Sequence, residues 1–154
     1  PFDGKNLLKL SEYKKITQLK IVSGERQSEI NHFKSLCHNK AVDIINPDIS
    51  VIGGIIRMLK VATIASEGGI LVSPHCWNSM TISASAMMHV CRIIYNNEKA
   101  EIFPEYFSFG DIFSIPGFMI NNSEAILQNR PGLGVIMDET ELKRLSEDYK
   151  ITLL

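Results

Sequence analysis

The sequence has 154 residues, 45% of them hydrophobic, and its 16 lysines and arginines nearly balance its 17 aspartates and glutamates, for a net charge of −1. A chain of this length and composition can bury one hydrophobic core, which is typical of a soluble globular domain rather than a disordered segment. The balanced charge argues against nucleic acid and anionic membrane surfaces as partners. No apolar run approaches the roughly 20 residues of a membrane span, because Arg57 and Lys60 interrupt the longest candidate, residues 51–65.

The three cysteines, Cys37, Cys76 and Cys91, are widely spaced and form no CxxC pair. Their odd number and spacing predict reduced thiols in a cytoplasmic protein rather than a disulfide framework or a structural zinc site. Residues 1–10 lack the apolar core of a secretory signal. They also lack an initiator methionine, so we expect a processed or partial chain.

Several segments repeat one plan, in which a short apolar run is followed by a break and then by a longer stretch with helical spacing. We expect strands at 19–25, 41–50, 68–76 and, more weakly, 100–107, and helices at 28–40, 51–69 and 81–97. Alternating strands and helices of this length predict an α/β fold with a parallel sheet. From residue 110 the pattern changes to turn signals and one C-terminal helix, Glu139 to Tyr149, which Asp138 and Glu141 could cap as a capping box.

An ionisable side chain lies at or near the end of each expected strand, at similar intervals along the chain. These residues are Glu25, Asp48, His75 and Glu105. Because the carboxyl ends of parallel strands lie at one edge of a sheet, the four side chains should lie close together. Carboxylates can hold a hard divalent cation, and an aspartate beside a histidine can fix its tautomer. Each residue alone could instead be an ordinary loop or turn residue, but their common placement favours a site.

Four motifs resemble the C-terminal half of the enolase superfamily, in its mandelate racemase/muconate lactonizing enzyme-like subgroup. They are SGE (23–25), NPDISVIGGI (46–55), SPHCWNS (73–79) and RPGLGVIMDE (130–139). The resemblance covers nearly the whole chain. It implies a TIM-type (β/α)7β barrel, of which residues 1–109 supply about strands 5 to 8. Residues 110–154 would form a C-terminal segment that packs on the barrel and on a capping domain.

The resemblance also implies roles for individual residues. Glu25 resembles a Mg²⁺ ligand, and Asp48 and His75 resemble a dyad in which the histidine is the general acid and base. Glu105 resembles the acid of the last strand, with Glu101 as its competitor. Trp77 could line the substrate pocket, or could equally fill the mouth of the barrel.

The implied reaction is Mg²⁺-dependent removal of the proton next to a carboxylate, through an enediolate. The favoured outcome is dehydration of an acid sugar or hydroxy acid, and the alternative is a racemase or epimerase of the same subgroup. The family's first two metal carboxylates and its Lys-x-Lys motif have no match in the sequence. We therefore expect the N-terminal half of the barrel and the capping domain as partners, in a homo-oligomer.

Two non-enzymatic readings stay open beside this one. A chain that lacks part of the family's machinery could be a degenerate or structural barrel fragment. An unrelated flavodoxin-like binding module is disfavoured, because the glycines after Asp48 do not have the G-x-G-x-x-G spacing of a phosphate-binding loop.

Overall fold

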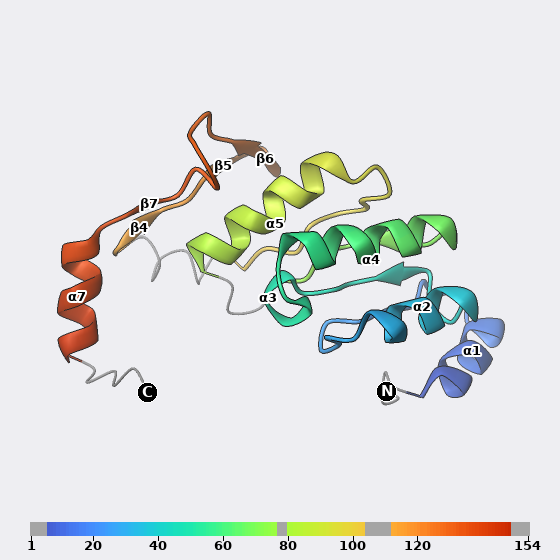
Figure 1. Cartoon of the computed structure of the whole chain (residues 1–154). Coiled ribbons are helices and arrows are strands. Elements are labelled where there is room, and N and C mark those ends of the chain that lie inside the picture. Colours follow the sequence, from blue (N-terminus) through green and yellow to red (C-terminus); the bar gives the residue numbers. More distant parts are fainter. Residues whose placement is uncertain (1–5, 77–79, 104–111, 149–154) are drawn as a thin grey trace.

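Short strands alternate with helices through the first part of the chain (Figure 1). The structure is a computed structural model that describes residues 6–76, 80–103 and 112–148. In chain order the first elements are α1 (Leu7–Ile16), β1 (Val22–Ser23), α2 (Ile30–His38), β2 (Ile44–Ile45), α3 (Ile49–Ile52), α4 (Ile55–Glu67), β3 (Leu71–Val72) and α5 (Thr81–Ile93).

The sheet is parallel, with the strand order β1-β2-β3. Ile44 pairs with Val22 on one side and with Leu71 on the other, so the central strand is β2. These strands lie within the first three ranges expected from the sequence, although each is shorter. The α/β class with a parallel sheet is therefore confirmed. Apolar residues at consecutive positions fill both faces of the central strand, as a sheet covered on both sides requires.

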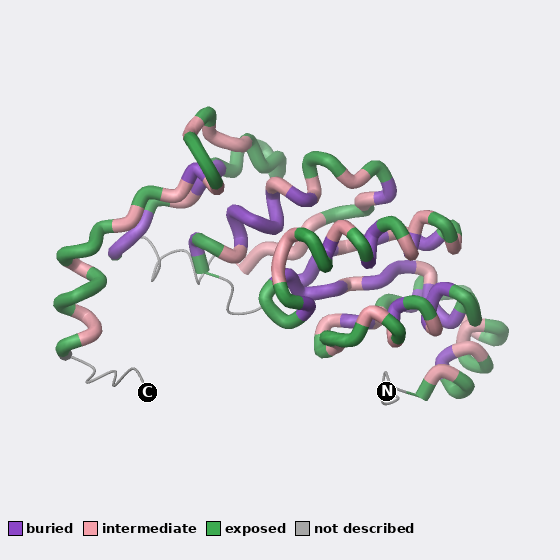
Figure 2. The backbone as a smooth tube through the Cα atoms, viewed as in Figure 1, coloured by how far each residue is buried: buried purple, intermediate pink, exposed green. Residues whose placement is uncertain are grey.

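Helices α2, α4 and α5 lie side by side over one face of the sheet (Figure 1). Their apolar residues recur at three- and four-residue spacing, and that stripe is buried, as the purple segments in Figure 2 show. Phe33, Met58 and Met87 are fully buried, one from each helix. This layer supports the strands whose ends carry the candidate site.

The sequence predicted one helix at 51–69, but the structure has two helices in this region. The short α3 ends at Gly53 and α4 begins after Gly54. Both glycines have positive φ, +94° and +96°, a backbone conformation that other residues adopt only with strain. The glycine pair thus lets the chain turn between α3 and α4.

The fourth strand expected at 100–107 is tested only over its first four residues. Residues 100–103 form no strand, and 104–107 lie outside the described residues. The parallel pairing with β3 occurs earlier, where Val72 N–H donates to Asn96 O and Glu98 N–H donates to Val72 O. The buried Asn96 amide holds the chain there by donating to the carbonyls of Ala62 and Ile70.

Helix α1 was not predicted from the sequence. Its apolar residues do not gather on one face, and only Leu10 is buried. Lys14 attaches the helix to the sheet, since its Nζ donates to Val42 O at 2.7 Å and lies 3.0 Å from Asp43 Oδ1. A tertiary ion pair, which no local pattern encodes, therefore holds this helix in place.

The C-terminal part forms two small antiparallel pairs and a helix. The elements are β4 (Ser114–Ile115), β5 (Phe118–Asn121), β6 (Glu124–Leu127), β7 (Ile136–Met137) and α7 (Glu139–Asp148), with β4 paired to β7 and β5 to β6. Buried hydroxyls fasten this part to α5, because Ser114 donates to Thr81 and Gly117 N–H donates to Ser85. The division of the chain into 1–109 and 110–154 stays a prediction.

Half of the expected capping box is formed at α7. Asp138 Oδ1 accepts the N–H of Glu141 at 3.0 Å, as a helix cap does. The reciprocal contact is not made, because Asp138 N–H donates to Phe113 O and the Glu141 carboxylate pairs with Arg144. Tyr149 lies outside the described residues.

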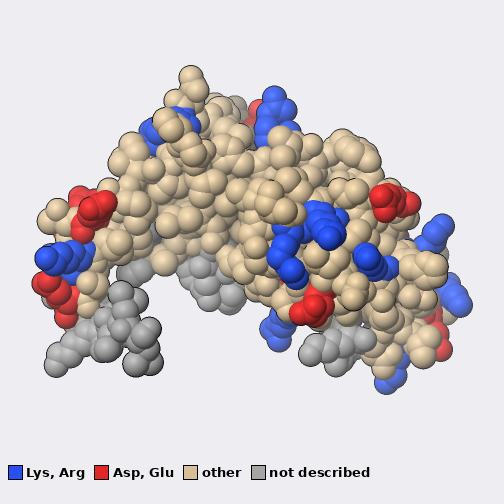
Figure 3. All heavy atoms as spheres, in the orientation of Figure 1, with Lys and Arg blue, Asp and Glu red and all other residues tan. Residues whose placement is uncertain are grey.

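The structure describes the surface charges and the thiols directly. Side chains of both signs appear on the face drawn in Figure 3, and those of lysine and arginine predominate over its right-hand half. Cys37, Cys76 and Cys91 form no disulfide with one another, and Cys37 and Cys76 are buried. Within the described ranges, no helix has both the length and the apolar character to cross a membrane.

Candidate active site

Three of the expected site residues meet at the carboxyl edge of the sheet. Glu25 follows β1, Asp48 follows β2 and His75 follows β3. They line a pocket of about 450 Å³ together with Glu101, which comes from the segment beside β3. The sheet thus brings together residues that are far apart in the sequence.

Asp48 and His75 form a buried pair. Asp48 Oδ2 lies 3.0 Å from His75 Nδ1, and the two residues are 3% and 9% exposed. Their backbones form a parallel bridge, in which His75 N–H donates to Pro47 O. A carboxylate only accepts hydrogen bonds, so this contact places a proton on Nδ1. The neutral imidazole then has its lone pair on Nε2, which faces the pocket.

The second oxygen of Asp48 caps a helix, a role that was not predicted from the sequence. Asp48 Oδ1 accepts the backbone N–H groups of Ser50 at 2.8 Å and Val51 at 3.2 Å, so Asp48 is the N-cap of α3. An aspartate directly before a short apolar run is a usual cap signal, and it was available in the sequence. Both oxygens are engaged, and the carboxylate is therefore fixed in orientation.

His75 Nε2 faces two more carboxylates. Glu25 Oε2 lies at 3.4 Å and Glu101 Oε2 at 3.6 Å. Both contacts become ion pairs when the imidazole is protonated, so an imidazolium at this position would be surrounded by three acids. The arrangement suits a histidine that takes up a proton and later gives it away.

The structure describes Glu101, but it does not describe Glu105, the other candidate for the acid of the last strand. Glu101 is held by its backbone N–H, which donates to Pro74 O at 3.0 Å, and its carboxylate points toward His75. Glu105 and Trp77 both lie outside the described residues. The assignment of Glu105 as the last-strand acid and the place of Trp77 stay predictions.

Glu25 is the candidate metal ligand of this chain. Its side chain is 43% exposed in the pocket and offers hard oxygen donors, which fit the preference of Mg²⁺. Gly24 precedes it with φ of +136°, and a Cβ there would lie 2.8 Å from the ring of Phe33. The described residues contain no group of three potential ligands, so Glu25 would need ligands from elsewhere to complete a site.

Four more residues form the walls of the pocket and were not predicted from the sequence. They are Arg26, Ser50, Val51 and Phe103. Arg26 Nε lies 3.3 Å from Glu25 Oε1, and its side chain is 89% exposed. In the sequence, Arg26 directly follows Glu25, and this position could have indicated that it lies at the site.

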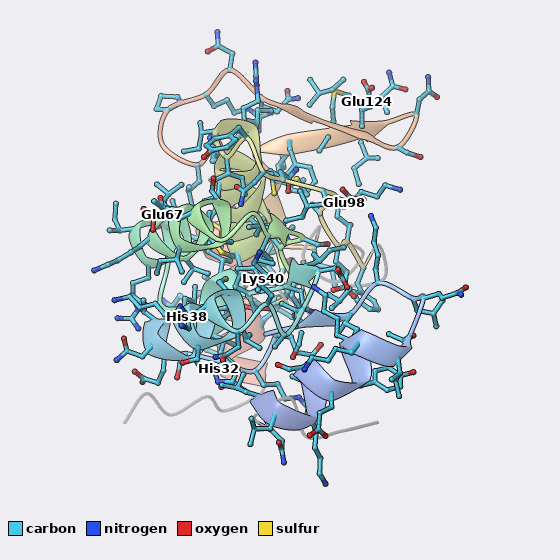
Figure 4. The ribbon with its side chains drawn as sticks, turned by 90° about the vertical axis from the view of Figure 1, so that its right-hand side faces the viewer. His32, His38, Lys40, Glu67, Glu98 and Glu124 are labelled. Atoms are coloured by element: carbon cyan, nitrogen blue, oxygen red, sulfur yellow. The ribbon has the colours of Figure 1, made fainter. Side chains whose placement is uncertain are left out.

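A larger groove, of about 910 Å³, lies between α5, the segment after Asn96 and the β5–β6 hairpin. Its charged residues include Glu98, on the segment after Asn96, and Glu124, on the hairpin, both labelled in Figure 4. Glu98 pairs with Lys20 at 3.6 Å, and no histidine lines the groove among the described residues. We therefore take the smaller pocket as the candidate active site, because it contains the acid–base pair.

Comparison with protein families finds a match to the enolase C-terminal domain-like family, over residues 1–141. Among curated proteins, a D-galactonate dehydratase from Xanthomonas oryzae pv. oryzae (strain PXO99A) is 30% identical over 144 residues. That alignment covers 86% of this chain and 36% of the dehydratase. The chain thus spans about a third of the length of this relative.

Solved structures agree with this match. An enolase from the environmental genome shotgun sequencing of the Sargasso Sea is 47% identical, with a TM-score of 0.90 over 94% of this chain and 39% of that one. An enolase from Pantoea ananatis with bound D-gluconate and Mg is 27% identical, with a TM-score of 0.83 over 94% of this chain and 35% of that one. The resemblance drawn from the four motifs is confirmed.

Proposed function

The chain belongs to the enolase C-terminal domain-like family, and from that premise we propose that it supplies the acid–base half of an active site that removes the proton next to a carboxylate. The substrate is a small acid sugar or hydroxy acid, and the overall reaction is the loss of water. The observation that supports this most strongly is the buried Asp48–His75 pair, whose Nε2 faces two further carboxylates in an open pocket.

Asp48 prepares His75 for the first step. By accepting a hydrogen bond from the Nδ1–H group, its carboxylate keeps the lone pair on Nε2, which faces the pocket. Because Asp48 also caps α3, the imidazole is oriented by an acceptor that cannot turn away. This is positioning rather than proton transfer.

His75 then acts first as the general base and later as the general acid for the same proton. Nε2 takes the proton from the carbon next to the substrate carboxylate, and the electron pair of the C–H bond moves toward that carboxylate. The imidazolium then gives the same proton to a hydroxyl on the adjacent carbon. The electron pair returns from the carboxylate to form a C=C bond between the two carbons, and the C–O bond breaks so that water leaves. Glu25 and Glu101, at 3.4 and 3.6 Å, stabilise the imidazolium between the two events.

Glu25 is the residue of this chain that would hold a magnesium ion. As is general for enolase-superfamily sites, which combine a Lys or His base with one or two Mg²⁺ ions, the bound metal stabilises negative charge on the substrate carboxylate oxygens. Glu25 offers carboxylate oxygens, which Mg²⁺ prefers, whereas zinc sites more often use thiolates and imidazoles, so the residue favours Mg²⁺ over zinc. We assign the acid that contacts the substrate on the far side to Glu105, with Glu101 as the competitor, and place Trp77 at the pocket wall.

We further propose that this chain contributes about strands 5 to 8 of a (β/α)7β barrel. Exposed apolar side chains support this. Val22, on the edge strand β1, is 48% exposed, and Ile120 and Ile126 of the β5–β6 hairpin line the larger groove. An exposed sheet edge and exposed apolar side chains favour coverage by the N-terminal half of the barrel and a capping domain, in a cytoplasmic homo-oligomer.

The test is proton exchange in D₂O, followed by NMR, on the complete enzyme that contains this chain. D-Galactonate and D-gluconate, which appear in the names of two similar proteins, are the first compounds to try with Mg²⁺. We expect loss of the α-proton signal and formation of a dehydrated product. His75→Asn should abolish both, and His38→Asn, which changes an exposed histidine of α2, should not.

The outcomes separate the candidate functions. Exchange that inverts the carbon without loss of water identifies a racemase or epimerase of the same subgroup. If a broad panel of acid sugars shows no exchange and the complete protein binds no Mg²⁺, the chain is a structural member of the family and the proposal is wrong.

A further inference from the structure

Arg26 is the permanent cation of the pocket. Among the described lining residues, Glu25, Asp48 and Glu101 carry negative charge, and Arg26 is the arginine or lysine that faces them. A substrate with a carboxylate and several hydroxyls would enter a pocket rich in acids, so it needs positive charge and hydrogen-bond donors. A guanidinium provides five N–H donors in a fixed plane and stays charged at all working pH values.

The geometry separates Arg26 from the acid–base pair. Arg26 Nε contacts Oε1 of Glu25, at 3.3 Å, and His75 Nε2 contacts Oε2 of the same carboxylate, at 3.4 Å. Arg26 and His75 therefore contact different oxygens of the Glu25 carboxylate, and both line the same pocket. A substrate whose reacting carbon lies at His75 Nε2 would meet Arg26 through another part of the molecule.

The Arg26 side chain is available for such a contact. It is 89% exposed, and its described ion pair uses Nε, which leaves the terminal nitrogens toward solvent. An exposed pair of this kind contributes little to stability. The charge is therefore better explained by binding than by folding.

We propose that Arg26 is a specificity-determining residue that donates hydrogen bonds to oxygen atoms at the end of the substrate remote from the reacting carbon. This inference rests on the proposed function and adds to it a substrate class, namely acids whose far end is rich in oxygen. That end is either a hydroxyl, as in an aldonate, or a second carboxylate, as in an aldarate.

Arg26 should also affect the cation at Glu25. Both need the oxygens of one carboxylate, so a bound divalent cation competes with the guanidinium and frees it for the substrate. Replacing Arg26 with a neutral residue should then tighten Mg²⁺ binding by about threefold or more, while it weakens substrate binding. A merely structural arginine would not change these two affinities in opposite directions.

The experiment uses Arg26→Gln and Arg26→Lys in the complete enzyme. Calorimetric titration with Mg²⁺ alone gives the metal affinity, and steady-state kinetics with an aldonate and the matching aldarate give KM and kcat separately. For Arg26→Gln we expect KM to rise about tenfold or more, most strongly for the aldarate, with a smaller change in kcat. Arg26→Lys should recover part of the loss, because it keeps the charge but not the planar donors.

Arg144→Gln is the matched control. Arg144 is also exposed and pairs through Nε with a nearby glutamate, Glu141, but it lies on α7. It should leave KM, kcat and Mg²⁺ affinity unchanged. Circular dichroism of each variant checks that the fold is intact.

The inference is overturned if the wild type is active and Arg26→Gln leaves both KM values and the Mg²⁺ affinity unchanged. It is also overturned if the loss is in kcat alone, which would place Arg26 in the chemical step. Failure of the proposed function looks different, because the wild type itself then shows no exchange that depends on Mg²⁺ and His75.

Discussion

Asp48 joins His75 to the start of α3 through the two oxygens of one carboxylate. Oδ2 lies 3.0 Å from His75 Nδ1, and Oδ1 accepts the N–H groups of Ser50 and Val51. The carboxylate cannot rotate without breaking one of these contacts. The cap therefore fixes the acceptor that selects the tautomer of the imidazole.

Asp48→Asn should separate these two roles. An asparagine caps a helix about as well as an aspartate, so the free energy of unfolding should change by about 1 kcal/mol or less. The amide group can instead donate toward His75 Nδ1, which moves the proton to Nε2 and removes the base. We expect kcat for proton exchange to fall about 10³-fold or more, as measured by NMR in D₂O.

Asp138→Asn is the control for that variant. Asp138 also caps a helix, α7, through Oδ1, but its described contacts include no histidine. Its exchange rate should match that of the wild type. If Asp48→Asn retained more than about a tenth of the wild-type kcat, the positioning role of Asp48 would be refuted.

Gly24→Ala should destabilise the fold next to the site. Gly24 has φ of +136°, and a Cβ there would lie 2.8 Å from Cε1 of Phe33, a fully buried ring of α2. Strain and overpacking together should lower the free energy of unfolding by about 2–4 kcal/mol in urea denaturation. Gly69→Ala has positive φ but open space around it, so it should cost only about 1 kcal/mol. Equal losses in the two variants would contradict the clash with Phe33.

The three strand ends could be predicted from the sequence because the signals are local. Short β-branched runs, each followed by a polar residue, predict where Glu25, Asp48 and His75 lie, and parallel pairing alone brings them to one edge. The glycine pair at Gly53 and Gly54 was visible too, but helical periodicity on both sides of it concealed the break.

The remaining features depend on contacts that no local pattern contains. The fourth parallel segment is set by the Asn96 amide, which binds the carbonyls of Ala62 and Ile70, rather than by the apolar run that follows it. Helix α1 is held by Lys14, across a long stretch of sequence. The contact of Arg26 with Glu25 joins neighbours in the chain, but its significance appears only once His75 is placed on the other oxygen.

Asp43 should make stability depend on pH in the acid range. The N–H of Ile21 donates to its Oδ2 at 2.8 Å, and this bond, with Lys14 at 3.0 Å, holds the pKa of the Asp43 carboxyl below its ordinary value. A lowered pKa in the folded state stabilises the fold above the unfolded pKa of about 3.9, and this contribution is lost as the pH falls through the folded pKa. The side chain is about one third exposed, so the effect is modest.

Asp43→Asn measures this contribution by urea denaturation. At about pH 6 the variant should be less stable than the wild type by about 0.5–1 kcal/mol, since it loses the charge but keeps an acceptor for Ile21. The difference should shrink as the pH is lowered from about 4 toward 2. A difference that stays constant over that range would mean that the Asp43 charge contributes nothing.

Cys37 and Cys91 should be poorly reactive toward alkylating reagents. Burial raises the pKa of the Cys37 thiol to about 11 and that of Cys91 to about 12. At about pH 8 only about one Cys37 in a thousand is then a thiolate, the form that reacts and binds metals. Mass spectrometry after treatment with iodoacetamide should show little labelling in the native protein and full labelling in urea. Rapid native labelling would reopen a role for these thiols, whereas protection leaves the chemistry of the pocket to its carboxylates and its imidazole.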